Sequence, residues 1–350
     1  MKVTALIPAH NEEATIAKTV ASLYEQIRPP DRIIVISDNC TDATGRIAAA
    51  AGVDVYVTVD NKDMKAGGLN QALDLVMPGL DDDDLIICMD ADTIVNTNFI
   101  SEAIIRFETS PVLLGGVSGT YLGKRHRSFP GWCQRNEFAR WGFDNRREHG
   151  NTVILSGAAS VFRTAALRKV KAAREAGKIG GQGVYNAETI TEDFELSLAL
   201  RATGSTIVNM LNVLITTSVK PTWRELWVQR LRWDRGINES LFDYGVKSYT
   251  WVVWMRRVLY AIFVPVSFLC LGVITWRIAT GNFLSISPFW IGVSGIIMTQ
   301  KAVTVFRSRG LWNSIAAFLV IPELPYDTFL QTVFIRSLWD QATNHTKSWR

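Results

Sequence analysis

Two carboxylates, Asp90 and Asp92, directly follow the apolar run Leu85–Met89. An unbroken apolar run predicts a strand buried on both faces, as in a parallel sheet covered by helices. Ligands of open α/β sheets bind beyond the carboxyl ends of the strands, so chemistry is expected at these two residues. Two carboxylates at a strand end can hold one hard divalent cation, with the other coordination positions left to water and a diphosphate.

The simpler alternative is that both aspartates only face solvent in a turn and cap the next helix, because acidic residues are common in turns. A neighbouring acidic run, Asp81–Asp84, precedes the strand and is expected at the opposite end of the sheet. We expect this run to be a solvated loop. The functional interpretation of Asp90 and Asp92 therefore depends on the other motifs in the chain.

Asp38 and Lys65 are two further candidates. Asp38 follows a second apolar run, Arg32–Ser37, and is expected at the same carboxyl edge as Asp90. Lys65 opens a helix with the sequence Lys-Ala-Gly-Gly-Leu-Asn, in which small residues let backbone amides approach an anion. A glycine-rich helix start with a solvated lysine explains this sequence equally well.

The sequence Thr191–Asp193 stands at the start of a helix predicted over residues 194–202. Thr191 is a predicted N-cap, and acidic residues are favourable in the first turn of a helix. A helix start is also a place where a carboxylate is both exposed and rigidly held. Upstream, the small residues Ser156–Ser160 either leave space for a bulky acceptor substrate or allow close packing of the chain.

Aromatic and basic residues gather between Pro221 and Gly245, around the sequence Gln-Arg-Leu-Arg-Trp at residues 229–233. Tryptophan and arginine side chains on one helix can stack on RNA bases. The more frequent explanation is a helix at a membrane interface, where indole and guanidinium groups lie among the lipid headgroups.

Strands and helices alternate in the first part of the chain, which predicts βαβ units and a parallel sheet, and hence an α/β fold. The predicted strands cover residues 3–8, 32–37, 53–57, 85–89, 113–121 and 152–162. The predicted helices cover residues 12–26, 65–77, 98–108 and 129–147, with another that ends at residue 51.

Composition narrows the class of protein. The 350 residues can form one large domain with an appendage, and the net charge of +4 gives no argument for a nucleic-acid partner. The four cysteines form no CxxC pair, which argues against a disulfide framework or a zinc site and fits a reducing compartment. Met1 to Thr4 lead directly into a strand, so no signal peptide is expected.

The apolar excess lies toward the carboxyl end. Val258–Trp276 is uncharged and close to the length that crosses a bilayer, and residues 283–299 form a second uncharged stretch. Basic residues before the first stretch and after the second predict a hairpin with both ends cytoplasmic.

The apolar segment Trp312–Ile321 is too short to span a bilayer and is interpreted as re-entrant or as half of a broken span. Apolar residues at helical spacing over residues 326–338 predict an interfacial helix, with Asp327, Gln331 and Asp340 on its other side.

Asp38, Asp90-Ala91-Asp92, Thr191-Glu192-Asp193 and Gln-Arg-Leu-Arg-Trp occur in this order, before the apolar stretches. In this combination the chain resembles the membrane-bound processive members of glycosyltransferase family 2, the group of cellulose, chitin and hyaluronan synthases. The resemblance covers roughly residues 1–245. It implies a GT-A fold, an α/β nucleotide-sugar-binding domain with a mostly parallel sheet, followed by interfacial and transmembrane helices. The implied parts are the GT-A domain (1–220), amphipathic interface helices (221–257), transmembrane helices (258–322) and an interfacial carboxyl-terminal helix with its tail (323–350).

The resemblance also implies roles for individual residues. Asp193 matches the catalytic base of the family, and Trp233 matches the residue that supports the acceptor sugar. Asp92, supported by Asp90, matches the ligand of Mg²⁺ or Mn²⁺. The residues implied in binding the donor nucleotide are Asp38, Lys65, Asp90, Gln229 and Arg232.

The implied reaction is an inverting transfer of a sugar from a nucleotide sugar to a hydroxyl of a glycan acceptor. UDP is the expected nucleotide, and a base such as Asp193 contributes roughly 10²–10⁴-fold to such a step. The implied protein is integral to the cell membrane, with its catalytic domain cytoplasmic. The expected partners are the donor, a glycan or glycolipid acceptor and the lipid bilayer, and a homo-oligomer is compatible with the sequence.

Two departures from the large synthases keep other functions open. The large synthases have amino-terminal spans that this sequence does not show, and the membrane part here is small for a channel. Transfer of a single sugar to a polyprenyl phosphate or another lipid is therefore the first alternative to polysaccharide synthesis. A catalytically inactive, membrane-anchored binding protein is the second, and the retained carboxylates argue against it.

Overall fold

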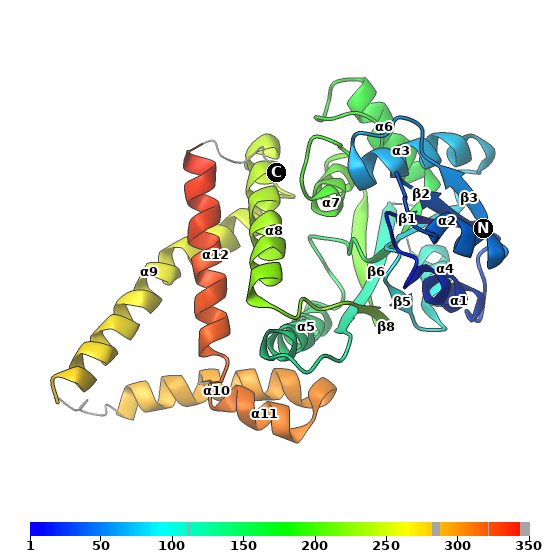
Figure 1. Ribbon diagram of the computed structural model, residues 1–350. Helices are drawn as coiled ribbons and strands as arrows, with labels where there is room; N and C mark the ends of the chain where they lie inside the picture. The colour runs from blue at the N-terminus through cyan, green and yellow to red at the C-terminus, as the bar shows by residue number, and fades with distance from the viewer. Residues whose placement is uncertain (111–112, 282–287, 321, 344–350) are drawn as a thin grey trace.

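The computed structural model describes residues 1–110, 113–281, 288–320 and 322–343, which form a sheet-and-helix domain with a group of long helices beside it (Figure 1). The strands are β1 (Val3–Ala9), β2 (Arg32–Ser37), β3 (Asp54–Val57), β4 (Leu85–Met89), β5 (Ile94–Val95), β6 (Leu114–Gly123), β7 (Ala159–Arg163) and β8 (Thr206–Thr217). The helices of the domain are α1 (Ile16–Tyr24), α2 (Thr44–Ala50), α3 (Met64–Val76), α4 (Phe99–Thr109), α5 (Phe129–Arg147), α6 (Thr164–Glu175) and α7 (Glu192–Ala202), with a 3₁₀ turn at Met77–Gly79.

Half of the sheet is parallel, as the apolar runs predict. Strands β3, β2, β1 and β4 are neighbours in this order and all run the same way. Leu6 in β1, for example, pairs with Ile34 on one side and Cys88 on the other. The ends of β2 and β4 therefore lie at one edge of the sheet, which is the arrangement expected for Asp38 and Asp90.

The other half of the sheet is mixed. Strand β7 runs antiparallel to its two neighbours, β4 and β6. Strand β6 runs parallel to β8, and β5, the last strand at this end of the sheet, runs antiparallel to β8. Strand β8 was not predicted, because its exposed and buried positions follow no clear period. The predicted strand 152–162 is shortened to β7, since Ser156 Oγ accepts hydrogen bonds from the amides of Ala158 and Ala159 and turns the chain there.

Each face of the sheet has its own apolar core because strand residues alternate between the faces. Ile7 and Ile87 pack on one face with α1, α2 and α4, while Leu6 and Ile86 pack on the other with α3, α6 and α7. All of these strand residues are fully buried. The double burial explains why the runs in β1, β2 and β4 are apolar without a break.

The acidic run before β4 differs from its prediction. Asp84 is only 4% exposed, and its carboxylate accepts from the amides of Lys2 at 2.7 Å and Asp81 at 2.9 Å. Asp83 pairs with Arg163. The prediction of a solvated loop is therefore wrong for Asp84, which holds the amino-terminal ends of β1 and β4 together.

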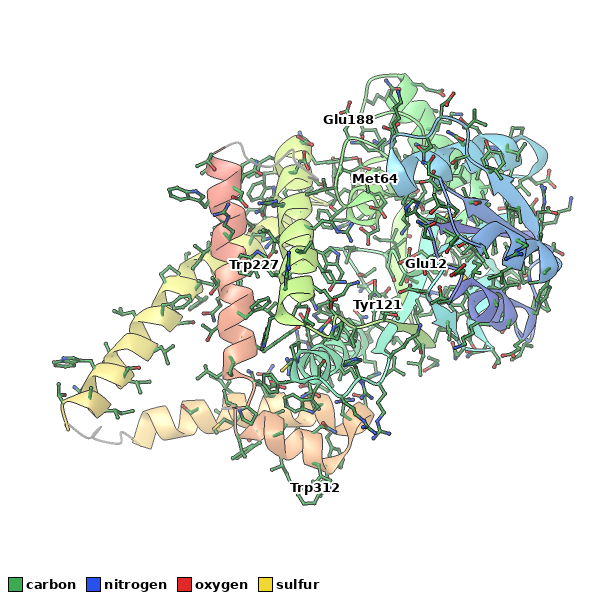
Figure 2. All side chains as sticks on the ribbon, in the orientation of Figure 1. Glu12, Met64, Tyr121, Glu188, Trp227 and Trp312 are labelled. Atoms are coloured by element: carbon green, nitrogen blue, oxygen red, sulfur yellow. The ribbon has the colours of Figure 1, made fainter. Side chains whose placement is uncertain are left out.

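The long helices follow the domain. They are α8 (Trp223–Tyr244), α9 (Trp251–Ala279), α10 (Pro288–Arg309), α11 (Leu311–Phe318) and α12 (Leu324–Ala342). Helix α12 lies along α8 (Figure 1), and Trp227 of α8 meets Phe329 of α12 with ring centroids 5.8 Å apart (Figure 2). Asp340 was predicted on the polar side of α12, but it is fully buried and pairs with Arg235 of α8. Packing on α8, rather than on a lipid surface, explains this burial.

Helix α9 contains the predicted span Val258–Trp276 and begins earlier, at Trp251. Within the described part of the chain, α9 is the one helix whose length and apolar composition suit a membrane crossing, and only 6% of its most apolar stretch is buried. The predicted second span begins among residues 282–287, which lie outside the described residues. From Pro288 onward that segment forms α10, which diverges from α9 and runs beside α11 beneath α5 (Figure 1).

Candidate active site

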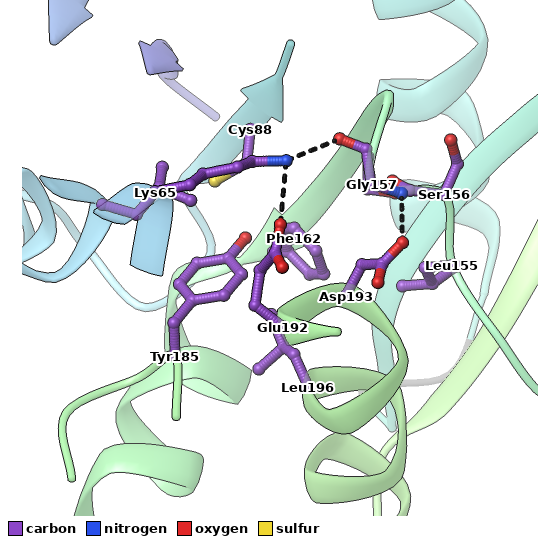
Figure 3. Close-up of a pocket in the computed structure, with 12 residues that line it drawn as sticks. Lys65, Cys88, Leu155, Ser156, Gly157, Phe162, Tyr185, Glu192, Asp193 and Leu196 are labelled. Atoms are coloured by element: carbon purple, nitrogen blue, oxygen red, sulfur yellow. Dashed lines mark hydrogen bonds and ion pairs between the residues drawn. The ribbon is translucent and has the colours of Figure 1, made fainter. Parts of the chain in front are cut away.

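Lys65, at the start of α3, is the centre of the candidate site (Figure 3). Its ammonium group lies 2.6 Å from Asp90 Oδ1 and 3.1 Å from Glu192 Oε1, and it donates to the Gly157 carbonyl at 3.3 Å. The alternative of a solvated lysine is therefore wrong. One side chain joins the end of β4, the loop before β7 and the start of α7.

The charges around Lys65 determine its protonation state. Burial lowers the pKa of Lys65, but the carboxylates of Asp90 and Glu192 outweigh burial and raise this pKa well above its usual value. Burial raises the pKa of Asp90, Lys65 opposes this effect, and the nearby charge of Asp92 adds to it. Lys65 is thus a permanent cation between carboxylates that repel one another.

Asp193 lies in the first turn of α7 and faces the same pocket. Its Oδ2 accepts from the Gly157 amide at 3.1 Å, and its Oδ1 accepts from the Phe194 amide at 2.8 Å. Burial, followed by repulsion from Glu192, raises the pKa of Asp193 to about 6. A carboxylate with this pKa accepts a proton near neutral pH more strongly than an ordinary aspartate does. Thr191, the predicted N-cap, occupies the cap position, but its side chain makes no capping hydrogen bond.

The pocket contains Tyr185, which the sequence alone did not single out, and Glu192, which precedes Asp193 in its sequence motif. Tyr185 and Glu192 line it together with Lys65, Gly157 and Asp193 (Figure 3). Gly157 belongs to the run of small residues noted in the sequence, and a Cβ atom there would lie only 2.6 Å from Asp193 Oδ2. The small residue is therefore required for the close approach of Asp193.

Asp38 forms a second centre at the end of β2. Its side chain is buried, and Oδ1 accepts from Thr58 Oγ1 at 2.8 Å and Asn61 Nδ2 at 2.7 Å. Asn61 Nδ2 also donates to the Met64 carbonyl, which links this centre to the residue before Lys65. The side chain of Asn61 fills the space beside Gly67, where a Cβ would lie 2.1 Å from Asn61 Oδ1. In this structure the glycine makes room for Asn61, whereas the sequence suggested room for an anion.

The Gln-Arg-Leu-Arg-Trp sequence lies on α8. Arg232 donates to the Ile190 carbonyl at 3.4 Å, just before the start of α7. Gly236 allows this approach, because a Cβ there would lie 2.2 Å from Thr191 Oγ1. The motif on α8 and the helix start that carries Asp193 are therefore in contact. Gln229 is half-buried on the same helix. In the described part of the chain, the hydrogen bonds and ion pairs of Lys65 and Asp90 do not include Gln229.

Trp233 is half-buried, and the guanidinium of Arg230 lies 4.5 Å from its ring centroid. Arg230 is buried and pairs with Glu137 of α5 at 2.6 Å. Tyr326 of α12 donates to the same carboxylate at 2.7 Å. This network joins α8 to α5 and α12 and holds the Arg230 guanidinium over the Trp233 ring.

A divalent cation fits the carboxyl end of β4. Asp90 and Asp92 would supply hard oxygen ligands, and a cation would relieve the repulsion between their negative charges. In residues 1–110, 113–281, 288–320 and 322–343, no three or more histidine, cysteine or acidic side chains gather to hold a metal ion. A cation at Asp90 and Asp92 would therefore need further ligands from a bound diphosphate and water, as the sequence suggested.

Solved structures support the GT-A-type architecture. The chain is similar to a mannosyltransferase from Pyrobaculum calidifontis, solved in complex with GDP-Man and Mn²⁺. The TM-score is 0.61 at 15% identity, over 97% of this chain and 86% of the other. At this identity the likeness concerns the fold alone.

Sequence comparisons extend the likeness to curated relatives. Poly-beta-1,6-N-acetyl-D-glucosamine synthase of Staphylococcus aureus is 27% identical over 245 residues, covering 68% of this chain and 55% of the relative. The synthase of Staphylococcus epidermidis is 27% identical over 242 residues, covering 67% and 54%. The chain thus spans about half the length of the curated relatives it matches. The sequence profile of "Glycosyltransferase like family 2" matches residues 2–236, which include Asp38, Lys65, Asp90, Asp193 and Trp233. The chain therefore belongs to glycosyltransferase family 2 and contains the enzyme domain of that family.

Proposed function

We propose that the chain transfers a sugar from a nucleoside-diphosphate sugar to a hydroxyl of a glycan acceptor, with inversion at the anomeric carbon. The observation that carries this proposal is the position of Asp193, whose carboxylate lies in one pocket with Lys65, the ion-pair partner of Asp90. A base next to a donor-binding edge is what direct displacement by a hydroxyl requires.

Asp193 takes the proton of the acceptor hydroxyl as its oxygen attacks the anomeric carbon. The bond from that carbon to the diphosphate breaks in the same step, so one displacement inverts the configuration and an α-linked donor gives a β-linkage. Two hydrogen bonds, from the Gly157 and Phe194 amides, hold the carboxylate in place. Its pKa of about 6 leaves it ionised and basic at neutral pH.

The leaving diphosphate needs positive charge beside it. We assign this role to Lys65 and Arg232, which approach from α3 and α8. Asp92, with Asp90, would hold Mg²⁺ or Mn²⁺, and a bound cation would supply a Lewis acid for the departing phosphate oxygens. Mn²⁺ in the Pyrobaculum mannosyltransferase supports this assignment.

The donor we propose is a UDP-sugar, with Asp38 binding the uracil. Among the described residues, the side-chain hydrogen bonds to Asp38 all end on Oδ1, which leaves Oδ2 to accept from a base N–H. The relatives named poly-beta-1,6-N-acetyl-D-glucosamine synthase support an N-acetylhexosamine polymer as the product. Gln229 is assigned to the diphosphate and Trp233 to the acceptor sugar.

We place the reaction at the cytoplasmic face of a membrane crossed by α9. The support is the exposed apolar surface of this helix, together with Arg256 and Arg257 before its central apolar part and Arg277 near its end. The single candidate span among the described residues also favours a second function, the transfer of one sugar to a lipid acceptor such as a polyprenyl phosphate.

Two measurements test these functions. The purified full chain is incubated with Mn²⁺ or Mg²⁺ and a panel of UDP- and GDP-sugars, and the released nucleoside diphosphate is measured. Product length then separates the two functions, because a ladder of β-linked sugars supports the polymerase and a single addition supports the lipid enzyme. Absence of release or transfer with every donor would refute both.

A further inference from the structure

Helix α11 has its apolar side chains on the outside. Leu311 is 59% exposed and Trp312 is 82% exposed, and Figure 2 shows Trp312 pointing away from the rest of the molecule. Ile315 and Phe318 share this exposed face, and Leu319 extends it at the carboxyl end of the helix. The small residues Ser314 and Ala317 face the protein instead.

The inverted orientation is fixed by contacts. Ser314 Oγ donates to the Ala302 carbonyl of α10 at 2.8 Å. Asn313 accepts from Trp132 Nε1 of α5 at 2.7 Å and donates to the Arg309 carbonyl at 2.7 Å. Rotation of the helix to bury Trp312 would break these bonds. A helix held in this orientation needs an apolar environment outside the protein.

An arginine patch, defined as Arg125, Arg127, Arg135 and Arg309, adjoins α11 at Arg309, which donates to Asn313 at 3.4 Å. The charges of Arg135 and Arg125 act on Arg309, and Arg127 follows Arg125 in the same loop. Arg309 precedes this helix and donates to Asn136 of α5 at 3.1 Å. Arg135 packs against Gly123, at the end of β6, just before the loop that carries Arg125 and Arg127.

The patch has excess positive charge. Across the residues that the structure describes, no carboxylate forms an ion pair with any of its four arginines. Burial, then the charges of Arg135 and Arg125, lowers the pKa of Arg309 to about 10. Anions placed here would relieve this repulsion.

We infer that α11 and the arginine patch form one membrane-docking surface, in which the apolar face enters the headgroup–acyl boundary and the arginines bind phosphate groups of anionic phospholipids. Eight residues cannot cross a bilayer, so α11 lies in the plane of the interface. Charge complementarity selects the occupant, since an apolar strip beside unpaired arginines matches an anionic lipid surface. This surface is distinct from α9, which is apolar throughout its central part.

Hydrogen exchange of the full chain in lipid nanodiscs tests the inference. Amides of residues 313–319 should exchange more slowly in nanodiscs with phosphatidylglycerol than in nanodiscs of phosphatidylcholine alone. Arg125→Gln with Arg127→Gln should weaken docking by about fivefold for each arginine removed. Both arginines are exposed, so this variant should fold normally. The matched control replaces Arg46 and Arg106, exposed arginines on α2 and α4, with glutamine.

A second variant tests the apolar face. Trp312→Gln with Leu311→Gln should abolish the protection in phosphatidylglycerol, whereas Ile27→Gln with Val59→Gln, at exposed apolar positions of the domain, should not. Equal exchange in the two lipids, or protection that grows with protein concentration instead, would overturn the inference, the latter in favour of a second copy of the chain. The inference rests on the proposed membrane association and not on sugar transfer, so failed docking with intact transfer, or the reverse, separates the two proposals.

Discussion

The Gly157 amide donates to Asp193 Oδ2 at 3.1 Å, and a Cβ on Gly157 would lie 2.6 Å from the same oxygen. The loop before β7 and the start of α7 therefore fit together only if residue 157 is glycine. Gly157→Ala should displace the Asp193 carboxylate and lower turnover by roughly 10- to 100-fold, as expected for a misplaced catalytic group. Turnover and nucleotide affinity are measured on the same preparation. Gly79→Ala is the control, because a Cβ at this position meets no atom within 4 Å, and its turnover and nucleotide affinity should be unchanged.

Asp193→Asn removes the proton acceptor and keeps the shape of the side chain. Turnover should fall by about two to four orders of magnitude, while donor and metal affinity survive. One hydrogen-bond acceptor is also lost, because an amide oxygen replaces two carboxylate oxygens, so the midpoint of thermal unfolding should fall only slightly. Normal turnover would move the base elsewhere, with Glu192 as the next candidate.

The pH dependence of turnover should report the raised pKa of Asp193. Its ionised form is the base, so turnover should rise with pH through about 6 and then level off. Glu192→Gln removes the negative charge that helps to raise this pKa, so the acidic limb should move to lower pH. An unchanged limb in this variant would show that another group controls the profile.

Transfer should require a divalent cation, because Asp90 and Asp92 end β4 where the diphosphate is assigned. Excess chelator should abolish turnover, and Mg²⁺ or Mn²⁺ should restore it. Asp92→Asn should raise the metal concentration needed for half-maximal activity. Asp81→Asn, an exposed aspartate at the opposite end of β4, is the matched control. Full activity in excess chelator would contradict the metal assignment.

Trp233→Ala should impair transfer more than donor binding. The substitution removes an aromatic face for a sugar, while Arg230 keeps its ion pair with Glu137. We expect the acceptor KM to rise by about five- to tenfold, which corresponds to the binding free energy of one aromatic ring contact. Trp233→Phe, which keeps an aromatic ring, should raise the acceptor KM less than Trp233→Ala does. An equal loss of nucleotide affinity would place Trp233 at the donor instead.

Much of the fold follows from local pattern. Strands buried on both faces must be apolar throughout, so β1, β2 and β4 are recognisable from composition. Because these strands run parallel, their carboxyl ends lie at the same edge of the sheet. The positions of Asp38 and Asp90 were predictable for this reason. The parallel half of the sheet was also predictable, whereas the mixed half was not, since β8 has no clear period and β7 starts late.

The sequence by itself determined which residues carry charge and at which strand or helix ends they stand. Only the tertiary structure decided their partners: Lys65 meets Glu192 and Gly157, and Asp340 is buried against Arg235. The physical reason is that such contacts join segments far apart in the chain, and a local pattern carries no information about which loops converge. The outward face of α11 was decided in the same way, by hydrogen bonds to α5 and α10.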